Sequence, residues 1–348
     1  MTQKTKTDDL RITRTRPLVA PAALSEEIPL SNRAAEFISA SRRSAELILD
    51  AADSRLLLVV GPCSIHDPVG ALEYAAKLKR LSDEVSDAIF IVMRVYFEKP
   101  RTVMGWKGLI NDPDLDRSFQ INKGLHLARQ VLADIAEVGL PAGTEFLDTT
   151  LGQFYADLIS WGAIGARTAE SQVHRELASG LSMPVGIKNR TDGNVQVAVD
   201  AILAARERHL FPSLTKEGGP AILETSGNPY GHLVLRGGRE TGPNYAAPAV
   251  DEALVLLRHA GLPEIAMIDC SHGNSGKDPR KQIEVVADVI EQRRGGRQSI
   301  RALMLESHLV AGRQDVTERP LTYGQSVTDA CLGFEETADL IRRLAEAV

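Results

Sequence analysis

The chain has 348 residues, 43% of them hydrophobic, and a formal net charge of −6. This length exceeds the ~250 residues of a typical eight-stranded α/β barrel and can supply a large core. The acidic balance argues against a nucleic-acid partner, and no apolar run approaches the ~20 residues of a membrane span. A polar N-terminus without a secretion signal and only three cysteines, Cys63, Cys270 and Cys331, indicate a cytoplasmic protein.

The first part of the chain differs in pattern from the rest. Pro17, Pro21 and Pro29 are expected to break any helix, which favours an extended arm over residues 1–30 that could hold one short strand. Ser31 is a suitable N-cap for an amphipathic helix that continues to about Asp53. We therefore expect residues 1–54 to form an arm and a helix ahead of a catalytic barrel over residues 55–348.

Eight short apolar runs recur along the remaining chain, and each ends within a few residues of a charged or metal-binding side chain. They are Leu56–Gly61, Ile89–Val92, Gly139–Thr144, Ala163–Ala166, Pro184–Ile187, Leu233–Leu235, Ile265–Ile268 and Ala302–Leu305. Amphipathic stretches follow them, and these predict helices over Val69–Val85, Asp116–Val138, Gln153–Ile159, His174–Gly180, Asn194–His209, Ala249–Ala260, Arg280–Arg293 and Phe334–Val348. This alternation predicts a TIM (β/α)8 barrel, whose strands carry the active site at their carboxyl ends.

One insertion interrupts the alternation. The segment Phe211–Gly231 is longer than a barrel loop requires and is rich in Pro, Gly and Thr. It predicts a small hairpin before the sixth barrel strand.

Four candidate metal ligands follow strands that become neighbours when a barrel closes. Cys63 follows the first run, His272 the seventh and Glu306 the eighth, and Asp329 lies in the segment after the eighth. A thiolate, an imidazole and two carboxylates suit a divalent Mn, Fe, Co or Zn ion. Taken singly, Cys63 could be a packed core thiol and His272 a hydrogen-bonded loop residue, but their convergence favours a metal site.

Cations form a second group at the same edge of the predicted sheet: Arg94, Lys99, Arg101, Arg167, Lys188 and Arg236. Few acids remain there to neutralise them, and clustered buried cations are costly without anions. Phosphate or carboxylate groups of substrates are the simplest partners. Lys99-Pro100-Arg101-Thr102 would form a second anion site, and Glu145 would either orient a cation or form an interior ion pair.

The sequence gives less support to other kinds of enzyme chemistry. No dinucleotide fingerprint, P-loop or serine-nucleophile elbow stands in a suitable context. Lys188 or Lys99 could in principle form a Schiff base with a carbonyl substrate, which leaves a Schiff-base aldolase as an alternative.

Long motifs around these residues resemble those of the type I microbial 3-deoxy-D-arabino-heptulosonate 7-phosphate (DAHP) synthases. The resemblance runs from about Asp8 to the C-terminus. Its motifs are Gly61-Pro62-Cys63-Ser64-Ile65-His66-Asp67, Met93-Arg94-Val95-Tyr96-Phe97-Glu98-Lys99-Pro100-Arg101-Thr102, Gly105-Trp106-Lys107-Gly108, Gly165-Ala166-Arg167-Thr168, Pro184-Val185-Gly186-Ile187-Lys188-Asn189, Leu235-Arg236-Gly237-Gly238, Asp269-Cys270-Ser271-His272 and Glu306-Ser307-His308.

The resemblance implies a metal-dependent condensation of phosphoenolpyruvate (PEP) with erythrose 4-phosphate, the first step of the shikimate pathway. By motif, the metal ligands are Cys63, His272, Glu306 and Asp329. The PEP-binding residues are Arg94, Arg167, Lys188 and Arg236, and the erythrose 4-phosphate loop is Lys99, Pro100, Arg101 and Thr102. Lys99, Arg167, Lys188 and Glu145 are the residues expected to act in catalysis.

The resemblance also implies regulation and assembly. The segment Asp8-Asp9-Leu10-Arg11-Ile12 resembles the family's N-terminal arm, which implies a homodimer or homotetramer inhibited by an aromatic amino acid. Gly152 stands where Phe- and Tyr-sensitive relatives tend to have Pro, which leans weakly toward Trp as the effector. Two further alternatives are a sister enzyme that condenses PEP with arabinose 5-phosphate and a catalytically inactive binding homologue.

Overall fold

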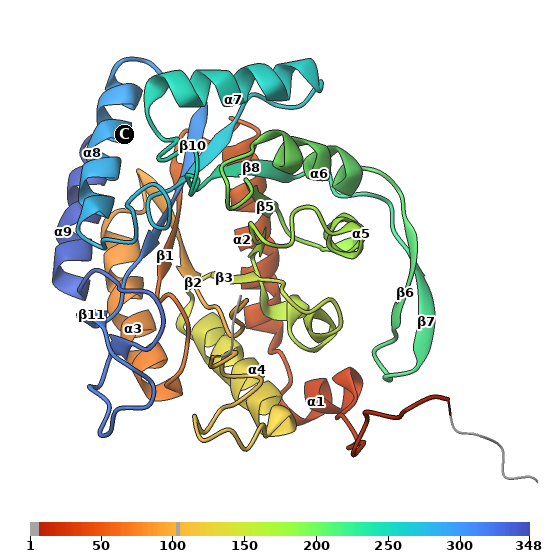
Figure 1. The fold of residues 1–348 in the computed structure, drawn as a ribbon. Coiled ribbons are helices and arrows are strands. Elements are labelled where there is room, and N and C mark those ends of the chain that lie inside the picture. The colour runs from red at the N-terminus through yellow and green to blue at the C-terminus, as the bar shows by residue number, and fades with distance from the viewer. Residues whose placement is uncertain (1–6, 102–104) are drawn as a thin grey trace, which may run out of the picture.

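Eight parallel strands close into a barrel in a computed structural model that describes residues 7–101 and 105–348 (Figure 1). The order around the barrel is β1-β10-β9-β8-β5-β4-β3-β2. The strands are β1 (Leu56–Gly61), β2 (Ile89–Arg94), β3 (Ala142–Glu145), β4 (Trp161–Ile164), β5 (Val185–Lys188), β8 (Gly231–Leu235), β9 (Ala266–Asp269) and β10 (Ile300–Glu306). The predicted TIM barrel is confirmed.

Strand residues alternate between two hydrophobic layers. Leu57 and Val59 of β1 point into the barrel, where they pack in one cluster with Trp161 of β4. Leu58 and Val60 belong to the outer cluster beneath the helices. Both faces of each strand are therefore buried, which explains why the strands read as continuous apolar runs in the sequence.

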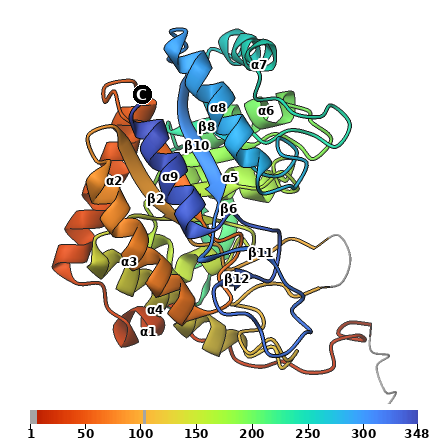
Figure 2. The same cartoon turned by 90° about the vertical axis from the view of Figure 1, so that its left-hand side faces the viewer.

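Helices cover the barrel on the outside: α3 (Pro68–Glu84), α4 (Ile121–Val138), α5 (Gln172–Gly180), α6 (Gln196–Arg206), α7 (Ala247–His259), α8 (Lys281–Arg294) and α9 (Phe334–Ala345). Figure 2 shows α9 between α3 and α8. Helix α2 (Asn32–Leu49) precedes the barrel. Ser31 is its N-cap, because the Ser31 hydroxyl accepts a hydrogen bond from the backbone N–H of Ala34, as predicted. None of the helices in the described ranges is both long and apolar enough to cross a membrane.

The predicted insertion is an antiparallel hairpin of β6 (Leu210–Leu214) and β7 (Pro220–Glu224), in which Leu210 pairs with Glu224. It projects away from the barrel beside α5 and α6 (Figure 1). A second strand pair, β11 (Val310–Arg313) with β12 (Gln325–Ser326), follows β10 and was not predicted.

Three predictions of local structure are wrong. Proline does not prevent a helix in the arm, because α1 (Pro21–Glu27) places Pro21 in its first turn, where no intrahelical donor is needed; no strand occurs in residues 7–20. The predicted helix Gln153–Ile159 is two short 3-10 helices, η1 (Leu151–Phe154) and η2 (Ala156–Leu158). Helix α4 starts at Ile121 rather than Asp116, because Arg117 and Phe119 have positive φ angles.

Candidate active site and metal centre

The carboxyl ends of the barrel strands surround a cavity of about 690 Å³. Its lining includes the predicted site residues Cys63, Arg94, Lys99, Pro100, Arg101, Glu145, Arg167, Lys188, Arg236, His272 and Asp329. Glu306 lines a small adjoining pocket that shares His272 and Asp329 with the cavity. The remaining predicted residue, Thr102, lies outside the described residues. The fold therefore brings the predicted metal and anion groups to one mouth.

Three of the four predicted metal ligands form a compact group. The Cys63 sulfur and one carboxylate oxygen each from Glu306 and Asp329 lie within 4.8 Å of one another. One soft sulfur donor with two oxygen donors fits a divalent transition ion. Burial, followed by the charge of Glu306, raises the pKa of the Cys63 thiol, so a bound cation would be needed to favour the thiolate.

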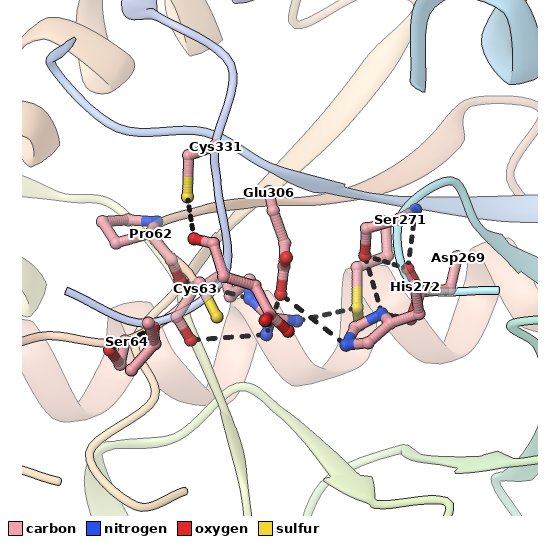
Figure 3. A network of polar contacts seen from close by, with 12 residues as sticks. Pro62, Cys63, Ser64, Asp269, Ser271, His272, Glu306 and Cys331 are labelled. Carbon is pink, nitrogen blue, oxygen red and sulfur yellow. Dashed lines mark hydrogen bonds and ion pairs between the residues drawn. The ribbon is translucent and has the colours of Figure 1, made fainter. Parts of the chain in front are cut away.

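The fourth predicted ligand, His272, lies beside this group. Its Nε2 atom is 3.8 Å from Oε1 of Glu306, and its Nδ1 atom is 2.9 Å from Oδ2 of Asp269 (Figure 3). A carboxylate on one ring nitrogen orients a histidine so that the other nitrogen can bind a metal. His272 has a φ of +56°, and its ring lies between Asp269 at the end of β9 and Glu306 at the end of β10.

Hydrogen bonds between distant segments position these ligands. The hydroxyls of Ser64 and Thr328 are 2.8 Å apart, which ties the loop after β1 to the segment that carries Asp329. On α8, the side-chain amide of Gln282 donates to the carbonyl of Glu306 and accepts from its N–H, at 3.1 and 2.8 Å. The parallel pairing of Gly61 with Glu306 then sets the end of β10 beside the loop of Cys63.

Two of the predicted anion-binding cations have carboxylate partners inside the protein, which corrects the expectation that acids would be scarce. Arg94 donates to Oε1 of Glu306 at 2.9 Å, and both side chains are buried. Lys188 donates to Oδ2 of Asp269 at 2.8 Å. Burial alone would raise the pKa of Glu306, but the nearby charges of Arg94 and His272 have the larger effect, so the pKa is lowered.

Other cations stand at the cavity without such partners. Among the described residues, neither Arg167 nor Arg236 forms an ion pair with a carboxylate, although both line the cavity. Burial lowers the pKa of Arg236. The backbone N–H of Arg236 donates to Oδ1 of Asn189 at 2.8 Å, which holds the end of β8 next to the end of β5. These two guanidinium groups remain available to an anionic ligand.

The loop after β2 contributes the second group of cations. The Lys99 ammonium lies 5.3 Å from the centre of the Tyr96 ring, and the backbone N–H of Lys99 donates to the carbonyl of Lys107. The Nε–H of Arg101 donates to the carbonyl of Trp106 at 2.8 Å. The described residues on the two sides of the gap at 102–104 thus contact each other, and Lys99, Pro100 and Arg101 line the cavity.

Glu145 ends β3 at the cavity and is 9% exposed. Neither of the alternatives proposed for it is decided, since no ion pair to Glu145 occurs among the described residues. Its Oε1 atom would lie 2.0 Å from a Cβ atom built on Gly165, so glycine is required for the carboxylate to occupy this place.

Two residues of the site were missed from the sequence. Asp269 was named only as the first residue of the motif that contains His272, yet it contacts both Lys188 and His272. These two cations lower its pKa well below the usual range against the opposing effect of burial. Lys277 received no role, yet its ammonium contacts Asp329. Asp269 could have been found as an acid adjacent to the proposed ligand His272, whereas Lys277 carried no sequence signal.

Comparison with known proteins agrees with this geometry. The model of the DAHP synthetase I family matches residues 28–342. The chain belongs to that family.

Relatives of this DAHP synthetase I family member include enzymes with two named sensitivities. The Phe-sensitive phospho-2-dehydro-3-deoxyheptonate aldolase of Escherichia coli K12 is 57% identical over 98% of this chain and 97% of its own. The Trp-sensitive enzyme of Enterobacter agglomerans is 54% identical over 99% and 98%. A solved aldolase of this name from Francisella tularensis SCHU S4 superposes with a TM-score of 0.95 at 54% identity, over 97% of this chain and 98% of its own. The resemblance to type I DAHP synthases is confirmed, and the chain is an enzyme of that family.

Proposed function

We propose that this enzyme condenses PEP with erythrose 4-phosphate to give DAHP and inorganic phosphate, the first step of the shikimate pathway. One observation carries the proposal: a compact group of S and O donors shares a cavity with Arg167 and Arg236, which have no carboxylate partner among the described residues. Such a cavity fits two anionic substrates next to a divalent ion.

The PEP site would consist of Arg94, Arg167, Lys188 and Arg236. Arg167 and Arg236 bind the phosphate and carboxylate oxygens, because guanidinium groups form paired hydrogen bonds with both. Lys188 and Arg94, already paired with Asp269 and Glu306, define the deeper wall of the site. The methylene carbon of PEP then faces the open part of the cavity.

Erythrose 4-phosphate would bind along the loop of Lys99, Pro100, Arg101 and Thr102. Two unit charges about 4 Å apart repel by ~4 kcal/mol at an effective dielectric constant near 20. The two cation groups remove this penalty and hold the aldehyde carbon near the PEP methylene carbon. Their main contribution is thus to position two like-charged substrates.

A divalent Mn, Fe, Co or Zn ion would be held by Cys63, His272, Glu306 and Asp329, and when bound it would supply electrophilic activation of the aldehyde. The new carbon–carbon bond joins the PEP methylene carbon to the aldehyde carbon. Water adds to the phosphate-bearing carbon of PEP, and the proton that it loses converts the former aldehyde oxygen to a hydroxyl. The C–O bond to phosphate then breaks, which releases inorganic phosphate and leaves a ketone. Lys99, Arg167 and Lys188 stabilise the anionic groups during these steps, and Glu145 orients one of the cations.

The deciding assay follows phosphate release and DAHP formation from PEP and erythrose 4-phosphate. Activity should disappear after chelation with EDTA and return with Mn²⁺. Arabinose 5-phosphate serves as the competing aldose and should give little product. Borohydride with either substrate should leave Lys99 and Lys188 unmodified. Retained activity in fully metal-free protein would rule out the metal-dependent scheme.

We also propose feedback inhibition by an aromatic amino acid, with Trp favoured. Gly152 lies in η1, where an added Cβ atom would meet the Phe146 ring at 3.1 Å. The hairpin reaches this region, because Lys216 donates to the carbonyl of Gln153 at 2.6 Å. Titration of the activity with Phe, Tyr and Trp tests the proposal, and stronger inhibition by Phe or Tyr would refute the preference for Trp.

The proposed assembly is a homodimer or homotetramer in which residues 1–54 contribute to the interface. The apolar side chains of Leu10, Ile12 and Leu18 are exposed along the arm, which is costly unless they are covered. Light scattering of the intact enzyme and of a variant with Leu10 and Ile12 changed to Ser tests this assignment, and a monomeric intact enzyme contradicts it.

A further inference from the structure

The carboxylate of Asp329 is held by a lysine from a different barrel loop. The Nζ atom of Lys277 lies 3.1 Å from Oδ1 and 3.4 Å from Oδ2 of Asp329. One ammonium therefore spans both oxygens of a proposed metal ligand. Lys277 lines the active-site cavity as well as the adjoining pocket next to Glu306.

Glu306 is paired differently from Asp329, because its cationic partners in the described part of the chain approach only one of its two carboxylate oxygens. Arg94 and His272 both approach its Oε1 atom, at 2.9 and 3.8 Å. Within residues 7–101 and 105–348, no hydrogen bond or ion pair reaches Oε2. Glu306 can thus bind an ion without losing its arginine, whereas Asp329 shares both of its oxygens with Lys277.

The two cations also differ in how easily they can move. The Arg94 side chain is 1% exposed and is further held by the Tyr96 ring, 3.7 Å from its Cζ atom. The Lys277 side chain is 63% exposed. An exposed ion pair contributes little to stability, and a lysine side chain that leaves it can be hydrated at once.

The backbone fixes where the Lys277 side chain starts. Lys277 has a φ of +68°, and its N–H donates to the carbonyl of His272 at 2.9 Å. A single turn thus carries one proposed ligand, His272, and the cation that covers another, Asp329. Removal of the ammonium need not disturb this turn, because the turn depends on the backbone.

We propose that Lys277 competes with the divalent ion for the carboxylate of Asp329 and is displaced when the ion binds. The inference rests on the proposed metal-dependent function and adds a residue that limits metal affinity. Because Lys277 contacts both oxygens of Asp329, an ion bound to either oxygen would repel its ammonium, and the exposed lysine gives way. The displaced ammonium then faces the cavity, where it adds to the positive charge available to anionic substrates.

The test measures Mn²⁺ affinity directly, by competition with a chromophoric chelator, in the full-length enzyme and without substrates. Lys277→Met should bind Mn²⁺ roughly threefold to tenfold more tightly than the unaltered enzyme at low salt, as expected for removal of an exposed competing charge. The advantage should shrink as NaCl is added, because salt screens the exposed pair. Lys277→Arg, which keeps the charge, should not gain affinity.

Lys281→Met is the matched control. Lys281 lines the same cavity and is exposed, but it forms no ion pair with the proposed ligands among the described residues. Equal tightening in Lys277→Met and Lys281→Met would reduce the effect to net charge and overturn the proposal, as would unchanged or weaker binding in Lys277→Met. Circular dichroism checks that each variant is folded. Failure of the unaltered enzyme to bind Mn²⁺ would instead refute the metal site itself.

Discussion

The Nη2 atom of Arg94 lies 2.9 Å from Oε1 of Glu306, and both side chains are almost fully buried. This ion pair joins a proposed PEP-binding residue to a proposed metal ligand. The proposed substrate and metal sites therefore share this ion pair, and loss of either partner leaves an uncompensated charge on a side chain that is almost fully buried.

Replacement of Arg94 by Met should lower the free energy of unfolding by about 3–5 kcal/mol, the cost of an unpaired buried charge. Urea denaturation in the presence of a chelator measures this change without a contribution from metal binding. Adding Glu306→Gln to the same chain should restore part of the loss. Arg342→Met is the control, since Arg342 pairs with Glu84 on the surface, and should cost less than about 1 kcal/mol. Similar losses in the two single variants would contradict the buried-charge argument.

Removal of the Cys63 sulfur should weaken binding of Mn²⁺ or Zn²⁺ by about 100-fold or more, because even outer-shell partners of a metal site contribute 10–100-fold. Chelator competition with Cys63→Ala provides the measurement. Cys270→Ala removes an equally buried thiol that lies outside the three-donor group, and it should bind the ions as the unaltered enzyme does. Equal affinities of the two variants would exclude Cys63 as a ligand.

Gly165→Ala should reduce kcat by at least about tenfold without a large loss of stability. The added Cβ atom would lie 2.0 Å from Oε1 of Glu145, so the carboxylate must move, and displacements of about 1 Å in an active site can cost up to 100-fold. Gly231→Ala in β8 is the control, because its nearest contact would be an ordinary 3.5 Å. Steady-state kinetics and thermal unfolding of both variants separate the two effects, and an unaltered kcat in Gly165→Ala argues against a role for Glu145.

Stability should fall in mild acid because of His232 inside the barrel. Burial lowers the pKa of His232 from 6.5 to about 4. Between pH 6.5 and pH 4, His232 is protonated in the unfolded chain but neutral in the folded protein. The free energy of unfolding therefore decreases as the pH falls from 6.5 toward 4. The total for this residue is on the order of 3 kcal/mol.

Urea unfolding at pH 7 and pH 5 measures the loss. His232→Gln should show a smaller difference between the two pH values, since an amide oxygen can still accept the hydrogen bond from Trp161 Nε1 but does not titrate. His259→Gln, at an exposed position, should keep the full difference. A pH dependence unaffected by His232→Gln would refute this assignment.

The sequence predicted the barrel well because its strands are buried on both faces and end in charged residues. Val59 and Val60, one inside and one outside, illustrate the burial. Helix α1 and the 3-10 helices were predicted less well, since short helices depend on tertiary contacts such as the hydrogen bond from Arg129 to the carbonyl of Phe154. Cys63 and Glu306 could be grouped from the sequence, because the first and last strands of a closed barrel are neighbours and each of these residues follows or ends one of them.

The charge partners were beyond sequence reasoning. Whether Lys188 meets Asp269 or a ligand depends on the reach and direction of two side chains across the barrel mouth. The pairing of Lys277 with Asp329 depends further on a turn with positive φ at a non-glycine residue, which propensity does not predict.

The proposed metal ligands Cys63 and Asp329 are far apart in the sequence and meet because β1 pairs with β10 and Ser64 contacts Thr328. During synthesis, the sulfur leaves the ribosome long before either acidic donor has been made. A growing chain therefore cannot assemble the proposed metal site, even when much of the barrel has already folded. Binding of an ion at the proposed site must wait for a nearly finished molecule.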